Sequence, residues 1–191
     1  MPQTTIVAVE NGIAEWNTAI DSREADSDWD FDIVPLANAS TNSKASGPKV
    51  FSHRDGHNPP GRGGGGGGED DGAGPDLEIQ IKKGGGVIAG SAQRSFADGF
   101  TVGVKIQISG GAFGLANGPA SVKEVTMHEV GHGLALGHHT NEADLMGPTV
   151  GYEGGGPSAC DLDGFEAAHQ WLTDGDDATG PAAVQPGSVT C

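Results

Sequence analysis

The residues best suited to chemistry lie close together between positions 128 and 139, in the stretch HEVGHGLALGHH. This stretch holds four of the 7 histidines of the chain, together with one glutamate. Residues four apart on an α-helix share one face, so His128 and His132 can direct two imidazole nitrogens at one point. Such nitrogens are typical ligands of zinc, which takes three protein ligands at most catalytic sites. The spacing therefore predicts a metal site on a helix.

Glu129 follows the first histidine, where its carboxylate can reach a water molecule held by the metal. It can accept the proton of that water during attack on a substrate and later deliver the proton to a leaving amine. The pattern H-E-x-x-H is typical of metallopeptidases that work in this way. The alternative from another class is a metal-stabilised binding domain without turnover, and an uncoordinated base would have no use there.

A third ligand must come from outside this helical face. His138 lies six residues after His132, so the chain has to turn back after the helix, and Gly137 could allow that turn. His139 is adjacent to His138 and could compete for the position. A downstream acid as third ligand would make the chain a zinc hydrolase of another subclass. The candidates of that kind are Glu153 and Glu166.

The elements expected around the histidines form an α+β domain with one twisted mixed sheet. Apolar residues every three or four positions predict an N-terminal amphipathic helix with Trp16 in the core. The S-x-x-E pattern of Ser121 and Glu124 predicts a capping box at the start of the histidine helix. Ser158 and Asp161 are expected to cap a last helix over 158–172. Alternating apolar residues predict strands at 28–35, 77–82 and 102–108, and the short segment 87–92 could form another strand.

The chain of 191 residues fits one catalytic domain over 1–173, followed by an acidic tail rich in proline and glycine at 174–191. Cys160 and Cys191 are the only cysteines, and they could form a bridge that ties down this tail or remain thiols.

Residues 36–75, which include a run of glycines at 63–68, are expected to form a long low-complexity loop. His53 and His57 lie in this loop, and we expect them to be exposed to solvent rather than to hold a second metal ion. The aspartates of the 28–35 strand leave calcium open as a further ion, although a solvated strand face explains them as well.

The chain is strongly acidic, with 26 acidic and 10 basic residues and a net charge of −16. Nucleic acid is excluded as a partner, because binding phosphates needs a basic surface. The excess of aspartate over glutamate and the scarcity of lysine favour adaptation to high salt. The sequence contains no apolar run of about 18 residues, so we expect no membrane span. The opening residues MPQTTIVAVE lack the pattern of a signal peptide.

Residues 128–138 resemble the metzincin signature H-E-x-x-H-x-x-G-x-x-H. Met146 in DLMGP is similar to the Met-turn of matrixins, the branch of metzincins that includes the matrix metalloproteases. The resemblance implies a zincin-like domain in which His128, His132 and His138 hold one catalytic zinc ion. It also implies that Met146 lies beneath the metal without binding it, and that the protein is a zinc-dependent endopeptidase.

The same resemblance implies that the strand at 87–92, with Ala89 and Gly90, pairs with an extended polypeptide substrate. Pro148 would begin the wall of the S1′ pocket, and the protein would be a secreted monomer. One position departs from the family, because the glycine of the signature is Ala135 here. An alanine with positive φ costs about 1–2 kcal/mol, so the turn could shift to Gly137.

Overall fold

The computed structural model describes residues 3–24, 32–34, 49–52, 76–82, 89–97, 100–109, 118–142, 144–149 and 155–169. The helices among them are α1 (Gln3–Glu24), α3 (Pro119–Gly133) and α4 (Ala159–Ala168). The strands are β1 (Asp32–Val34), β2 (Lys49–Ser52), β3 (Asp76–Lys82), β4 (Gly90–Ala97) and β5 (Phe100–Ser109). The α+β class expected from the sequence is confirmed. Within these ranges, no helix combines the length and the apolar character needed to cross a membrane.

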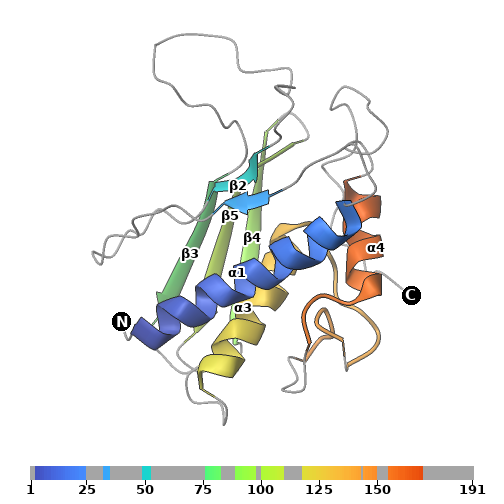
Figure 1. Ribbon diagram of the computed structural model, residues 1–191. Helices are drawn as coiled ribbons and strands as arrows, with labels where there is room; N and C mark the ends of the chain where they lie inside the picture. Colours follow the sequence, from blue (N-terminus) through green and yellow to red (C-terminus); the bar gives the residue numbers. More distant parts are fainter. Residues whose placement is uncertain are drawn as a thin grey trace, which may run out of the picture.

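The five strands form one mixed sheet in the order β1-β2-β3-β5-β4. β3 and β5 run parallel, and every other neighbouring pair is antiparallel. β4 is the last strand in this order and pairs only with β5 among the described residues, so it forms an edge of the sheet (Figure 1).

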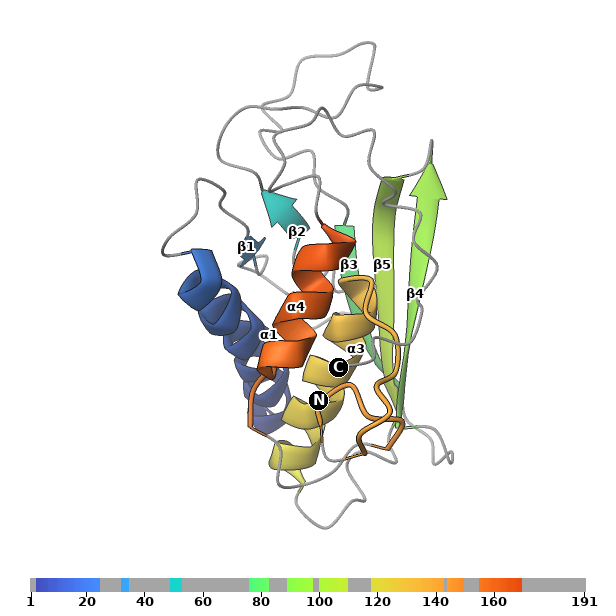
Figure 2. The same cartoon turned by 90° about the vertical axis from the view of Figure 1, so that its right-hand side faces the viewer.

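The helices pack on one side of this sheet, with α3 in contact with β4 and β5 and α1 in contact with α3 (Figures 1 and 2). Val104, Ile106 and Ile108 alternate along β5 and are buried in the core between sheet and helices. Trp16 of α1 is fully buried, and its indole Nε1 donates to the carbonyl oxygen of Met127 at 2.8 Å. The prediction that Trp16 belongs to the core is therefore confirmed.

Two strand predictions need correction. The segment 36–75, expected to be a loop throughout, contains the short strand β2. The expected strand at 87–92 corresponds to β4, which begins at Gly90 and continues beyond position 92 to Ala97. Its small and polar residues lack the apolar alternation by which strands are identified. The strands expected at 77–82 and 102–108 correspond to β3 and β5, whereas only 32–34 of the expected 28–35 strand lie within the described residues.

The predicted start of α3 is wrong. The helix begins at Pro119 after Gly118, and no side chain caps it. Proline suits the first turn because its missing N–H would have no partner there in any case. Ser121 and Glu124 lie inside the helix instead, and both are buried, with exposures of 0% and 7%.

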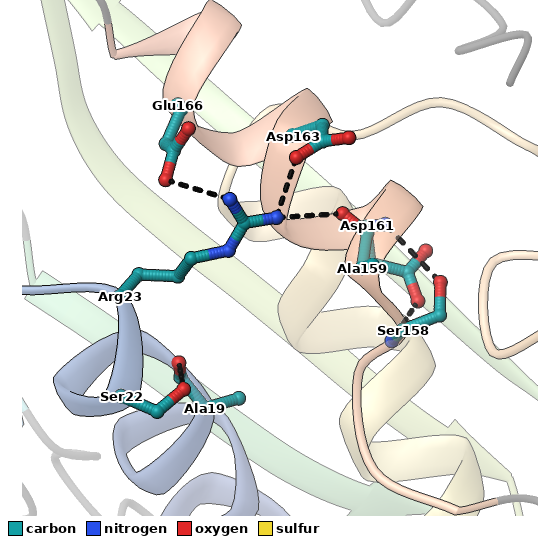
Figure 3. A network of polar contacts seen from close by, with 8 residues as sticks. All are labelled: Ala19, Ser22, Arg23, Ser158, Ala159, Asp161, Asp163 and Glu166. Carbon is teal, nitrogen blue, oxygen red and sulfur yellow. Dashed lines mark hydrogen bonds and ion pairs between the residues drawn. The ribbon is translucent and has the colours of Figure 1, made fainter.

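The predicted cap of α4 is confirmed (Figure 3). Ser158 accepts a hydrogen bond from the backbone of Asp161, whose side chain accepts one from the backbone of Ser158. Leu162 and Phe165 on this helix are buried. Arg23 at the end of α1 bonds to α4, so the two helices are joined at the surface.

Candidate metal centre

Three histidine rings meet at the end of α3. His128 and His132 come from the helix, and His138 comes from the segment that follows it. Nε2 of His138 lies 3.3 Å from Nε2 of His128 and 3.2 Å from Nε2 of His132. The three residues form a group that could hold a metal ion, each through one ligand atom. The predicted meeting of these three histidines is confirmed.

Two backbone carbonyls orient the rings of the helical histidines. Nδ1 of His128 lies 2.6 Å from the oxygen of Leu145, and Nδ1 of His132 lies 2.9 Å from that of Leu136. A carbonyl oxygen can only accept, so each Nδ1 carries the proton and each Nε2 presents a lone pair. Burial lowers the pKa of His128, and it lowers that of His132 to about 4. Both rings are therefore neutral at pH 7 and can act as ligands.

A Schellman motif turns the chain after α3 and brings in the third histidine. The backbone N–H of Leu136 donates to the oxygen of Gly131 at 2.9 Å, and that of Ala135 donates to the oxygen of His132 at 3.1 Å. Ala135 takes the left-handed conformation of this motif, with φ of 75°. The turn has therefore not shifted to Gly137, and alanine occupies the position where glycine is favoured.

Replacing Ala135 by Gly should stabilise the fold by about 0.5–1 kcal/mol. The left-handed conformation costs alanine about 1–2 kcal/mol, and the greater freedom of glycine in the unfolded chain removes part of the gain. Urea denaturation would measure the change. Ala14→Gly, at an exposed position inside α1, is the matched control and should instead destabilise by about 1 kcal/mol. An equal loss of unfolding free energy in both variants would contradict a strained conformation at Ala135.

Met146 packs against the turn of α3 that joins the two helical histidines. It is 2% exposed, and a side chain at Gly131 would collide with its sulfur. Its carbonyl oxygen accepts the backbone N–H of His139 at 2.6 Å, which closes the segment between them. Met146 thus supports the ligand-bearing turn by packing, while Pro148 is exposed two residues later.

Glu129 is a buried carboxylate next to the edge strand. It is 5% exposed, and its Oε2 has no hydrogen-bond partner. A Cβ atom at Gly90 would lie 2.5 Å from Oε1, so only glycine at the start of β4 leaves room for this side chain. Burial raises the pKa of Glu129 to about 7. A carboxyl group with this pKa can both accept and release a proton near neutral pH.

The predicted substrate residues differ in what they can offer. Gly90 faces Glu129, as described above. The carbonyl oxygen of Ala89 already accepts from the backbone N and from Oγ of Ser109, at 2.8 and 3.1 Å. Main-chain groups for pairing with an added strand must therefore come from other positions of β4.

The competing third ligands within the described residues point elsewhere. Glu166 lies on α4 and pairs with Arg23 at 3.6 Å (Figure 3), and it is not part of the histidine group. His139 directs its Nε2 to the sulfur of Cys160 at 3.1 Å. The remaining candidates for metal ligands lie outside the described residues: Glu153, His53 and His57.

Arg94 is a residue near the site that the sequence analysis did not identify. It lies on β4 four residues after Gly90, so the two share the face of the strand that also packs Ala92 against the core. Its positive charge contributes to the lowered pKa of His132 and of His169. The strand register alone would have placed it on this face, had the limits of β4 been known.

Comparison with known proteins found no relative: no family model, curated protein or solved structure matches the chain. The interpretation of the site therefore rests on its own geometry. That geometry consists of three imidazole nitrogens close enough to hold one ion, and the residue after His128 is the buried Glu129.

Proposed function

We propose that this protein is a zinc-dependent endopeptidase of the metzincin type. The observation that carries the proposal is the arrangement of the three Nε2 atoms, two of which must be unprotonated. Zinc binds imidazole nitrogen at about 2.0–2.1 Å in a tetrahedral shell, which separates two ligand atoms by about 3.3 Å. The separations of Nε2 of His138 from the other two Nε2 atoms, 3.3 and 3.2 Å, match this value.

The choice of zinc follows from the ligand atoms. Neutral imidazoles suit zinc and other late transition metals, whereas calcium and magnesium prefer oxygen ligands. Three protein ligands also leave one position open, as at catalytic zinc sites. When bound, zinc would polarise a carbonyl group and lower the pKa of water, so that the water could lose a proton and attack near neutral pH.

Glu129 supplies the proton transfers. Its position beside His128 and its buried Oε2 fit a general base that takes the proton of the attacking water. The same carboxyl group then donates that proton to the amine of the cleaved peptide. Its raised pKa suits both steps, because the proton has to be held for a short time and released again.

The substrate is proposed to be an extended polypeptide that adds to the free edge of β4. Strand addition uses main-chain hydrogen bonds and so accepts many sequences. Gly90 places this edge directly against Glu129, which would bring the backbone of the substrate close to the base. By the same resemblance the enzyme would act outside the cell as a monomer, and Pro148 would border the S1′ pocket.

The test is cleavage of a mixed fluorogenic peptide library by the purified chain in zinc and high salt. We expect turnover that stops with a zinc chelator and returns when zinc is added back. The cut sites would then outline the pocket. A folded, zinc-loaded chain that cleaves no peptide would overturn the proposal and favour a metal-stabilised binding domain.

A further inference from the structure

The side chains of the edge strand β4 alternate between the two faces of the sheet. Those at the odd positions of 91–95 are exposed on the outer face. On the inner face, Ala92 packs against the core and Gly90 lies against Glu129. Arg94 is the next residue on this inner face, and it is half-buried. The strand that borders the proposed base thus carries a cation, which proton transfer at Glu129 does not require.

The register of the sheet places Arg94 close to the helical histidines. Arg94 lies opposite Val104 of β5. Val104 packs closely on α3, because a Cβ atom at Gly133 would lie 2.8 Å from its Cγ1. Gly133 is the residue after His132, and the positive charge of Arg94 contributes to the lowered pKa of His132. The guanidinium group is therefore on the same side of the sheet as the metal centre and acts on it electrostatically.

The main chain of the inner-face residues is turned toward the outer edge of β4. The backbone N–H of Ser109 donates to the oxygen of Ala89, so these two opposite residues form a hydrogen-bonded pair. Such pairs alternate with non-bonded pairs along an antiparallel ladder. The N–H and C=O groups of Gly90, Ala92 and Arg94 therefore point away from β5, and an added strand would pair with them.

A substrate strand on this edge would place one of its side chains beside Arg94. Directly opposite residues of neighbouring strands have Cβ atoms about 4.5–5.5 Å apart on the same face. A guanidinium group presents five N–H donors in one plane, so it can bind a carboxylate in addition to its contacts within the protein. Burial lowers the pKa of Arg94, because the charged group has lost part of its hydration. A carboxylate on the substrate would compensate for that loss.

We propose that Arg94 gives the peptidase a preference for substrates with a glutamate or aspartate opposite it on the added strand. This inference rests on the proposed function and specifies its substrate class, extended peptides with an acidic residue near the cut bond. Gly90 lies beside the base, and Arg94 follows four residues later on β4. In an antiparallel arrangement, the commoner form of strand pairing, the acid lies on the amino side of the cut bond, within about four residues of it.

The overall charge of the chain makes such a preference informative. A net charge of −16 repels acidic peptides in general, so a preference for glutamate has to come from a local cation. Lys105 offers a matched control on the outer face of the same sheet. It lies opposite Gln93 and pairs with Glu78 at 3.4 Å. Lys105→Met removes the same charge as Arg94→Met but from the wrong face to meet the substrate side chain.

The experiment is a positional scan of the peptide library, with each position fixed as Glu or Gln and the cut bond located by mass spectrometry. We expect one position to favour Glu by roughly ten- to hundredfold in kcat/KM, the range of a hydrogen bond to a charged group. Arg94→Met should abolish this preference, Arg94→Lys should keep part of it, and Lys105→Met should keep all of it. The ratio of two peptides on one variant cancels a general loss of activity or folding.

Binding to the zinc-loaded Glu129→Gln chain provides a second readout that needs no cleavage. Fluorescein-labelled Glu and Gln members of the scan would be titrated with this chain, with and without Arg94→Met. We expect the same preference for Glu in Kd, and we expect it to disappear in the double variant. Binding that depends on the acid and on Arg94, in a parent that cleaves no peptide, would overturn the proposed function alone.

Two results would overturn this inference. One is a parent chain that cleaves, and a Glu129→Gln chain that binds, Glu and Gln peptides equally well or not at all at every position. That result decides the question even if Arg94→Met does not fold. The other is a preference for Glu that persists unchanged in a folded Arg94→Met chain. Cleavage without any acid preference would leave the proposed function standing.

Discussion

Replacing Glu129 by Gln is expected to lower kcat/KM by roughly two to four orders of magnitude, the usual contribution of a general base. Glutamine fills the same space but accepts no proton. Zinc should stay bound, because the ligand group consists of three histidine nitrogens and does not include Glu129. Turnover of a fluorogenic peptide and zinc content by atomic absorption would be measured on the same samples.

Glu124→Gln is the matched control. Glu124 lies on the same helix, is also buried, and also has its pKa raised by burial to about 7, but it lies one helical turn before His128 and does not face Gly90 of the edge strand as Glu129 does. Its amide variant should keep turnover within roughly tenfold of the parent. Full activity in Glu129→Gln would exclude this residue as the base. An equal loss of turnover in both variants would indicate that either substitution perturbs the structure of α3.

Glu129→Gln is also expected to change the free energy of unfolding of the metal-free chain. The unfolded carboxyl group loses its proton near pH 4.5, and the folded one loses it near pH 7. Between these values the folded state binds the extra proton, so stability falls as the pH rises and stays low above pH 7. Glutamine avoids this loss. The free energy of unfolding of Glu129→Gln should therefore exceed that of the parent by about 2–3 kcal/mol at pH 8 and by much less at pH 4.

The second large effect is expected from His138→Ala, which removes the ligand outside the helix. Loss of an outer partner of a metal ligand typically costs 10–100-fold in affinity, so loss of the ligand itself should cost more than about 100-fold. Turnover should fall with it at limiting zinc. Competition with a chromogenic chelator would measure the affinity directly.

The rival subclass, with a downstream glutamate as third ligand, makes the opposite prediction. In that case His138→Ala would bind zinc almost as tightly as the parent. Glu166→Gln is the control within the described residues, and it should leave zinc affinity unchanged, since Glu166 pairs with Arg23 on the surface. Unchanged affinity in His138→Ala would show that the third ligand lies in another part of the chain.

The meeting of the histidines could be predicted because helical geometry is regular. Four residues make about one turn, so His128 and His132 had to share a face wherever the helix lay. The approach of His138 followed from the resemblance and from the need for a third ligand. The carbonyls that orient the rings belong to Leu136 and Leu145, whose side chains carry no sign of this role.

Other features depended on packing that local patterns do not encode. Ser121 and Glu124 match a capping box, but the helix starts earlier, at Pro119, and both side chains are buried. Ala135 accepts a left-handed conformation because the Schellman hydrogen bonds hold it there, against the preference of the residue itself. In each case other interactions outweighed a local preference of about 1–2 kcal/mol: burial of the two side chains in α3, and the Schellman hydrogen bonds at Ala135.

The hydrogen bond from Trp16 to Met127 has a consequence for synthesis of the protein. It joins residues 111 positions apart, and it links the first helix of the chain to the helix that carries His128. At translation rates of about 5–20 residues per second, α1 waits roughly 5–20 s before its partner has been made. During that time β1 is already available to α1, through the hydrogen bonds between Asn17 and the backbone of Ile33, but the surface of α3 is not. Contacts between residues so far apart in the sequence form late, and α1 can dock on α3 only after the histidine helix has left the ribosome.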